Sequence, residues 1–330
     1  MNMIITWLHQ ALLFGTVIML AAIGETLTEK VGNLNLGTPG TMCVSAAAGV
    51  IGVDAYLNSV QEPSVFLCIL VAILPAFFTG MLMGLIYSFM TTSLRINQNV
   101  VGLVLTIFGT GMAEFLSRYF IKTASGNVSY PFAYAVFSAR IPWLSTALGA
   151  VSGIFFSYGF MFYFSIFLAI ATTLFLNRTR IGLNLRAVGE NPGTADAAGI
   201  SVGRYKYITT CIGSGIVGLA GIYCVMDFKN GVWATTDITT IQAFGWLAVA
   251  LVIFVTWKPV HLIWGAAVFG IVYWAYQYLP GMLNIAISTD LAQMLPYLIT
   301  IIVLIVVSLR SKRENQPPAS LGIAYFREDR

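Results

Sequence analysis

The chain has 330 residues, of which 58% are hydrophobic and only 9% are charged, and its formal net charge at neutral pH is +4. Soluble globular domains carry about 25% charged residues, so this composition excludes a soluble protein and predicts an all-α, polytopic transmembrane helical bundle. The 17 basic residues are scattered through the chain rather than aligned along one face, which argues against a nucleic-acid-binding protein.

Apolar runs of about 20 residues predict about nine membrane-crossing helices, with eight or ten as alternatives. The runs lie at 4–24, 38–53, 64–90, 99–120, 154–176, 207–228, 240–257, 260–279 and 291–309. The segment 141–153 is too short to cross separately and is expected to be interfacial or re-entrant. The first ten residues contain no lysine or arginine and no evident cleavage site follows, so the first run is predicted to be a retained helix.

Lysine and arginine predict the orientation, because they are enriched in cytoplasmic loops. If the loop 177–206 is cytoplasmic, only Arg118, Lys122, Arg140 and Lys229 fall on the outer side. The N-terminus is then outside and the C-terminus cytoplasmic. We expect residues 1–309 to form the transmembrane domain and the polar tail 310–330, which contains two prolines, to be cytoplasmic and disordered.

The segment Gly24–Gly40 (GETLTEKVGNLNLGTPG) lies between the first two predicted spans. Its glycines and proline exclude a regular helix throughout, and broken backbone near membrane depth is tolerated where protein buries it or where it lines a wet cavity. The segment therefore predicts a gate or wall of a translocation path, against the alternative of a plain loop. The candidate residues are Glu25, Glu29, Asn33, Asn35 and Gly37.

The fourth span contributes further polar candidates. Asn97, Asn99 and Thr106 belong to it or to its beginning, and their side chains are suited either to a polar neutral solute or to hydrogen bonding between helices. Glu114 is the one acid placed clearly within a predicted span. Because ion-coupled transporters hold ionisable groups at membrane depth, this scarcity of acids weighs against a proton- or sodium-driven mechanism.

The stretch Arg186–Ile200 (RAVGENPGTADAAGI) is polar and lies between two apolar runs. Asn191 is predicted to cap a short helix that begins with Pro192, and Gly199 is predicted to end it in the left-handed conformation. So short a helix is marginal by itself in water, so it is expected to bind a partner surface.

Other patterns are interpreted as structural. The sequence GSGIVG from Gly213 to Gly218 fits the dinucleotide-binding fingerprint, but it lies inside an apolar run, and it is expected to pack helices together. Gly80 and Gly84 are given the same role. The four cysteines show no CxxC spacing, so buried, inert thiols are expected and no metal site is predicted. His9 and His261 are assigned no catalytic role.

The chain resembles the permease subunits of ABC importers of the ribose, branched-chain amino-acid and nucleoside clade. The resemblance rests on Arg178–Tyr207 (RTRIGLNLRAVGENPGTADAAGISVGRYKY), on Ser214–Tyr223 and on Phe244–Val260. The first-loop segment is similar to that of the nucleoside branch, with Gly24-Glu25 and Asn35-Leu36-Gly37 matching. Thr106 replaces a frequent asparagine and Pro39 an acid, so a sugar, a nucleobase-like solute or an amino acid stays open as the substrate.

The resemblance implies a non-enzymatic subunit of the bacterial cytoplasmic membrane without a cofactor of its own, since ATP and Mg²⁺ belong to a partner ATPase. Further implied partners are a second permease subunit, identical or related, and an extracellular solute-binding lipoprotein that delivers a small-molecule solute. The short helix becomes the cytoplasmic coupling helix that docks on the ATPase. The implied coupling residues are Arg186, Gly189, Glu190, Asn191, Pro192, Ala195, Asp196, Ala198, Gly199 and Ile200. An ion-coupled secondary transporter, a membrane-embedded enzyme and a passive channel are the competing hypotheses.

Overall fold

The computed structural model describes residues 2–121, 127–139, 157–283 and 316–326, and the single positions Met294, Leu298, Ile301 and Ile305. The predicted all-helical architecture is confirmed over these residues, with a single two-stranded sheet as the exception within the same ranges. The elements are α1 (Asn2–Lys30), α2 (Thr38–Ser59), α3 (Val65–Ser88), the π-helical turn η1 (Phe89–Ser93), α4 (Gln98–Phe120), β1 (Asn127–Ser129), α5 (Pro131–Phe137), α8 (Phe160–Arg178), α9 (Arg180–Glu190), α10 (Pro192–Ala197), α11 (Val202–Tyr223), the π-helical turn η3 (Cys224–Phe228), β2 (Val232–Ala234), α12 (Asp237–Phe254) and α13 (His261–Leu283).

Seven helical segments of the described residues are long and apolar enough to cross a membrane, so the predicted count of about nine is not confirmed. Each of the first seven predicted runs corresponds to one of them, and α13 coincides with the predicted run 260–279. The segment 141–153 and, apart from the four single positions, the run 291–309 lie outside the described residues. The chain is a multi-pass membrane protein.

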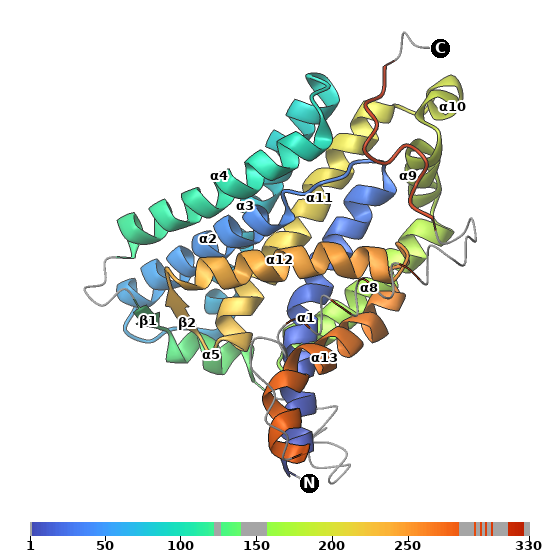
Figure 1. Ribbon diagram of the computed structural model, residues 1–330. Helices are drawn as coiled ribbons and strands as arrows, with labels where there is room; N and C mark the ends of the chain where they lie inside the picture. Colours follow the sequence, from blue (N-terminus) through green and yellow to red (C-terminus); the bar gives the residue numbers. More distant parts are fainter. Residues whose placement is uncertain are drawn as a thin grey trace.

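Helices α1 and α11 form the centre of the bundle, and both are largely buried (Figure 1). Helix α11 packs against α1, α2 and α3, while α12 and α13 pack against α1. Small residues permit this close packing: a Cβ on Gly218 would lie 2.3 Å from the carbonyl oxygen of Ala76, and one on Gly80 would lie 2.3 Å from that of Ser214. The predicted packing role of GSGIVG is thereby confirmed, because the motif lies in the middle of a buried helix.

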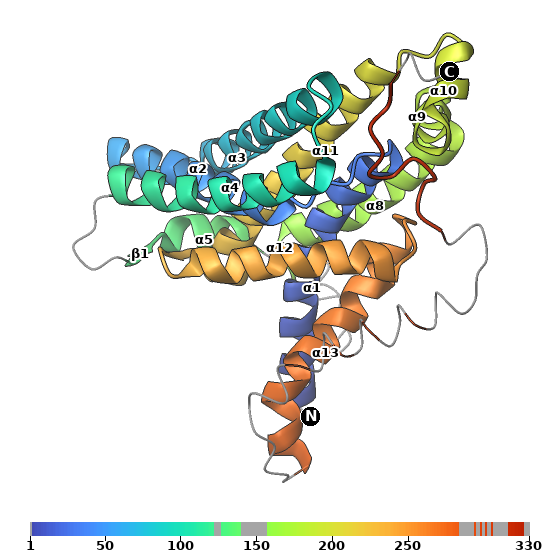
Figure 2. The same ribbon diagram turned by 45° about the horizontal axis from the view of Figure 1, so that its top comes forward.

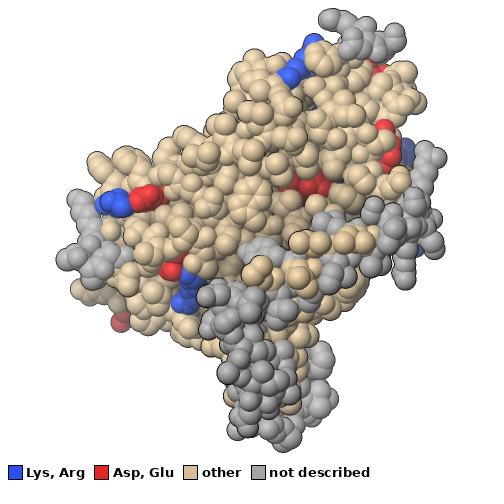
Figure 3. All heavy atoms as spheres, viewed as in Figure 1, with Lys and Arg blue, Asp and Glu red and all other residues tan. Residues whose placement is uncertain are grey.

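The connecting segments gather at two ends of the bundle. One end, here called the α10 end, contains α9, α10, the loop 31–37 and the segment 316–326. The other, the β end, contains β1, β2 and α5, with Asn127 paired to Ala234, Val128 to Trp233 and Ser129 to Val232 (Figures 1 and 2). Most of the face seen in Figure 3 is uncharged, with its few charged side chains near the edges and in one central recess.

The prediction that the tail is disordered is wrong for residues 316–326. Ser320 is buried, with its amide 3.0 Å and its hydroxyl 2.6 Å from the carbonyl oxygen of Gly189. The amide of Gly322 donates to the carbonyl of Gly32 at 3.3 Å. The segment runs beside α9 and the beginning of α11 in both ribbon views, so specific hydrogen bonds order a stretch whose composition alone predicts disorder.

Candidate functional site

Helix α1 continues beyond the predicted span end at residue 24 and reaches Lys30. Glu25 and Glu29 therefore lie on one face of a membrane-spanning helix, at positions i and i+4, and both are fully buried. The hydroxyl of Thr38 donates to Glu25, and the indole N–H of Trp257 donates to Glu29. The sequence-based placement of these acids outside the spans is thus corrected, because partners from α2 and from beyond α12 supply the hydrogen bonds that allow their burial.

The loop 31–37, here called the first-loop wedge, has no regular structure along most of its length and is nevertheless buried. Three side chains from two helices, α3 and α4, satisfy its backbone. The Gln98 amide oxygen accepts from the Leu34 N–H, the Tyr87 hydroxyl donates to the Leu34 carbonyl, and the Thr106 hydroxyl donates to the Leu36 carbonyl, each at 2.7 Å. The wedge is therefore held as part of the protein interior, as the argument from broken backbone predicts.

Most of the predicted path residues meet around this wedge. Asn33 donates to the hydroxyl of Thr210 at 2.9 Å, and the side chain of Asn35 accepts from the amide of Gly37 at 2.9 Å. A Cβ on Gly37 would lie 2.8 Å from that same Asn35 oxygen, so the turn has no room for a side chain. Together with Glu25, Glu29 and Thr106 these residues form a buried polar cluster at the α10 end.

Asn97 and Asn99 are not part of that cluster. Both are exposed, and the side chain of Asn97 accepts from the amides of Asn99 and Val100, which caps α4. Gln98, between them, is the residue that faces inward. Helical periodicity carries the signal for this, since Gln98 shares one face with Val101, Gly102, Leu105 and Thr106, all of which are buried. Tyr87, Thr38, Trp257 and Thr210 were also missed, because their roles depend on contacts between distant segments.

The predicted local structure of the short helix is confirmed. Asn191 caps α10 by accepting from the amide of Thr194 at 3.0 Å, and Pro192 occupies the first turn. Gly199 has a positive φ of 83°, and the amide of Ile200 donates to the carbonyl of Ala195 at 3.0 Å. This pattern ends a helix in the left-handed conformation, for which glycine is the favoured residue.

Helix α9 packs closely against the end of α1, and α9 and α10 have one side exposed. A Cβ on Gly189 would lie 2.1 Å from the carbonyl oxygen of Lys30, so α9 approaches the end of α1 closely. Within α10, Ala195 is buried, and Asp196 accepts from the hydroxyl of Tyr325 at 3.0 Å. The exposed members of the predicted coupling set are Arg186, Glu190, Asn191, Ala198 and Gly199, while Pro192, Asp196 and Ile200 are half-buried.

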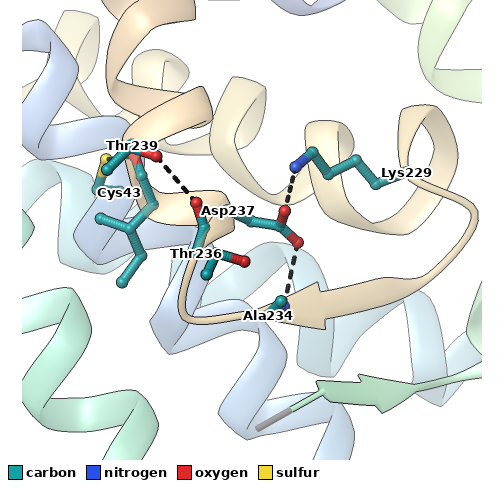
Figure 4. A network of polar contacts seen from close by, with 7 residues as sticks. Cys43, Lys229, Ala234, Thr236, Asp237 and Thr239 are labelled. Carbon is teal, nitrogen blue, oxygen red and sulfur yellow. Dashed lines mark hydrogen bonds and ion pairs between the residues drawn. The ribbon is translucent and has the colours of Figure 1, made fainter.

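The β end has a polar arrangement that sequence reasoning did not identify (Figure 4). Asp237, at the beginning of α12, forms an ion pair with Lys229 and accepts from the amide of Ala234 at 3.1 Å. Nearby, burial and the adjacent Asp54 carboxylate raise the pKa of the Tyr130 phenol, which donates to Asp54 at 3.0 Å. These contacts tie the β1–β2 sheet to the ends of α2 and α12.

The structure agrees with the interpretation of the cysteines as free thiols. Cys43, Cys68 and Cys224 are buried and Cys211 is half-buried, and none is in a disulfide. Within the described ranges, histidine, cysteine and acidic side chains form no group of three or more that is arranged to hold a metal ion. The polar cluster at the wedge consists mainly of hydrogen bonds between the wedge and side chains of the surrounding helices.

Comparison with known proteins adds independent information. The family profile described as branched-chain amino acid transport system / permease component matches residues 7–304. A provisionally assigned glucose ABC transporter permease protein of Haloferax volcanii is 29% identical over 95% of both chains. A nucleoside ABC transporter permease protein of Lactococcus lactis is 28% identical over 89% of both, and a guanosine ABC transporter permease protein of Bacillus subtilis is 29% identical over 78% of both.

No solved structure matches the chain. The similarity to the permease family nevertheless extends through α1 to α13 in order, and it includes both the first-loop wedge and the segment that carries α9 and α10. The chain therefore belongs to the family of permease components of the branched-chain amino acid transport system, and it is a non-catalytic, cofactor-free membrane subunit of an ABC transporter.

Proposed function

We propose that this chain is a permease subunit of an ABC importer that translocates nucleosides. The observation that carries the proposal is the similarity to the nucleoside permease of Lactococcus lactis and the guanosine permease of Bacillus subtilis, over most of each chain. The first-loop residues Gly24, Glu25 and Asn35–Gly37, by which the chain resembles the nucleoside branch, lie together at the buried polar cluster.

A sugar is the second candidate substrate. The Haloferax volcanii relative, provisionally assigned to glucose, matches this chain over 95% of its length. Nucleosides and sugars both present a hydroxylated ring, so the two hypotheses differ in whether the binding protein also recognises a base.

Uptake measurements distinguish the two substrates. The permease, its ATPase and its solute-binding protein are expressed together in cells that lack their own nucleoside and glucose uptake. We expect ATP-dependent accumulation of labelled guanosine that unlabelled adenosine reduces and glucose does not. Accumulation of glucose without that of any nucleoside would replace the nucleoside proposal with the sugar proposal.

We further propose that α10 is the cytoplasmic coupling helix. It is short, capped at both ends and held against α1 through α9, and its outer residues are exposed at the end of the molecule. A partner ATPase would bind that outer face, and closure of the two ATPase halves would move α9 and the end of α1. In this arrangement the α10 end faces the cytoplasm, the β end faces the binding protein, and a second permease subunit completes the transporter.

Substitutions in α10 test the coupling role. Gly199→Leu places a side chain at a positive φ and Pro192→Asp alters the first turn, so each is expected to abolish most ATP-driven uptake while membrane insertion is retained. Gly203→Ala is the matched control, because a Cβ there meets nothing within 4 Å. Uptake and co-purification of the ATPase at the normal level in both test variants would contradict the proposal.

The first-loop wedge is proposed to close the translocation path on the cytoplasmic side. Its position supports this role: buried non-helical backbone is held by α3, α4 and α11 directly beside two buried carboxyl groups. The end of α1 connects the wedge to α9 through the close approach of Gly189 and Lys30. Movement of α10 would thus pass to α9, and from α9 to the end of α1, which leads directly into the wedge.

A further inference from the structure

A second polar site lies at the α10 end, apart from the wedge cluster. It is a cavity of about 130 Å³ between η1, the beginning of α11 and the C-terminal segment. Figure 3 shows basic side chains at this end of the molecule, over the ends of α3 and α4. The side chains that line the cavity are those of Thr91, Thr92, Arg95, Val202, Lys206 and Tyr325.

Among the described residues, the buried positive charge at this cavity has no anionic partner. Lys206 is only 2% exposed, and it makes no hydrogen bond or ion pair with any residue that the structure describes. Of the described residues that line the cavity, two are cations and none carries a carboxylate. Asp196 lines a neighbouring cavity and accepts from Tyr325. Burial of an unpaired cation costs free energy. A bound anion would offset that cost, so the site is suited to an anionic ligand.

Further hydrogen-bond donors without partners lie at the cavity, beside Thr91 and Tyr325, whose hydroxyls donate to the Tyr87 carbonyl and to Asp196. The hydroxyl oxygen of Thr92 is buried and has no hydrogen-bond partner in the described part of the chain. Helix α11 begins at the same cavity with Val202 and Gly203, and the side chain of Ser201 does not cap it. The first amides of a helix have no intrahelical acceptor, and they carry the positive end of the helix dipole. Lys206 lies one turn further along the same helix.

The size of the cavity restricts the ligand. A water molecule occupies about 30 Å³ in the liquid, so a space of about 130 Å³ accommodates a tetrahedral oxyanion. Amides at a helix N-terminus, a lysine, an arginine and a threonine hydroxyl together provide the donors that phosphate oxygens accept from.

We propose that this cavity binds a phosphate group. The group belongs either to the head of an anionic phospholipid or to a soluble phosphate compound, since both present the same oxygens. A phosphate bound here would join η1, α11 and the C-terminal segment. Tyr325 lines the site and also donates to Asp196 on α10, so occupancy would stabilise the contact between the C-terminal segment and α10.

Thermal unfolding of the full-length protein tests the proposal. The protein in zwitterionic detergent is titrated with inorganic phosphate at constant ionic strength, with chloride as the replaced anion, and tryptophan fluorescence is followed. We expect a saturable rise in Tm with phosphate, because a ligand that binds the folded state raises its stability. No rise with phosphate, together with no rise in the lipid comparison below, would overturn the proposal.

Nanodiscs separate the two sources of phosphate. Discs of phosphatidylcholine alone are compared with discs that contain phosphatidylglycerol. If the site binds a lipid head, phosphatidylglycerol raises Tm and removes the response to free phosphate. If it binds a soluble compound, the response to free phosphate persists in both kinds of disc.

Variants connect the response to the cavity. Lys206→Met, Arg95→Gln and Thr92→Val are each expected to weaken phosphate binding roughly tenfold or more, because each removes a donor to a charged group. Arg204→Gln is the matched control, since Arg204 lies on the same turn of α11 but does not line the cavity. The wild-type response in Lys206→Met and Thr92→Val would contradict the proposal.

The same variants are also compared before phosphate is added, in a detergent whose head group contains no phosphate. There Lys206→Met is expected to have a Tm no lower than that of the wild type, and a lower Tm would show that Lys206 has a different role.

Discussion

Gly109 and Gly111 lie two residues apart on α4 but meet different surroundings. A Cβ on Gly109 would lie 2.4 Å from the carbonyl oxygen of Gly40, whereas one on Gly111 would meet nothing within 4 Å. The contact at Gly109 is between two backbones, which cannot rotate away as a side chain can. The two glycines therefore make different contributions to the packing of α2 against α4.

This difference predicts opposite effects of the same substitution. Gly109→Ala is expected to destabilise the protein by about 1–3 kcal/mol, the usual cost of overpacking. Gly111→Ala is expected to be neutral or stabilising by up to about 1 kcal/mol, because alanine favours a helix more than glycine. Thermal melting of the two purified variants measures the effects, and equal Tm values would show that α2 and α4 are not in backbone contact at Gly40.

The buried acids change one argument made from the sequence. Glu25, Glu29 and Asp227 are all buried within spanning segments. The expected scarcity of intramembrane acids is therefore not observed, and it no longer weighs against an ion-driven mechanism. The family similarity over residues 7–304, rather than the count of acids, supports the assignment to an ABC transporter.

At the scale of elements, the beginning of α4 has two faces with separate roles. Asn97 and Asn99 face outward, and Gln98 turns inward to hold the first-loop wedge through the Leu34 amide. The wedge has little regular structure of its own, so its conformation depends on such side chains. Removing one of them leaves a buried backbone group without a partner.

The beginning of α4 therefore offers a test with its control at the next residue. Gln98→Met keeps a side chain of similar length but leaves the Leu34 N–H unsatisfied, which is expected to cost about 1–3 kcal/mol. Asn99→Ala changes an exposed side chain and is expected to alter stability by less than about 0.5 kcal/mol. Thermal melting and hydrogen exchange of the wedge amides measure both, and unchanged exchange in Gln98→Met would refute this account of the wedge.

At the scale of the whole molecule, the described connections between spans lie either at the α10 end or at the β end. The wedge, α9, α10 and the segment 316–326 share the first end, and β1, β2 and α5 share the second. The distribution of basic residues predicts that the α10 end faces the cytoplasm.

Cysteine labelling tests that orientation. In a background in which the four native cysteines are replaced by serine or alanine, Glu190→Cys at the α10 end and Glu62→Cys near the β end place thiols at exposed positions. A membrane-impermeant maleimide is expected to label Glu62→Cys in intact cells and Glu190→Cys only after permeabilisation. The reverse pattern would invert the topology and with it the cytoplasmic role of α10.

The sequence alone determined the membrane class, the positions of seven spans and the local structure of α10. These depend on local hydropathy and on caps such as Asn191 and Gly199, which act within a few residues of the chain. Only the tertiary structure decided that Glu25 and Glu29 are buried, that Gln98 rather than its neighbours faces inward, and that residues 316–326 pack against Gly189 and Asp196. The physical reason is that each of these depends on a partner distant in sequence: Trp257 reaches Glu29 across 228 positions, and no local pattern encodes that contact.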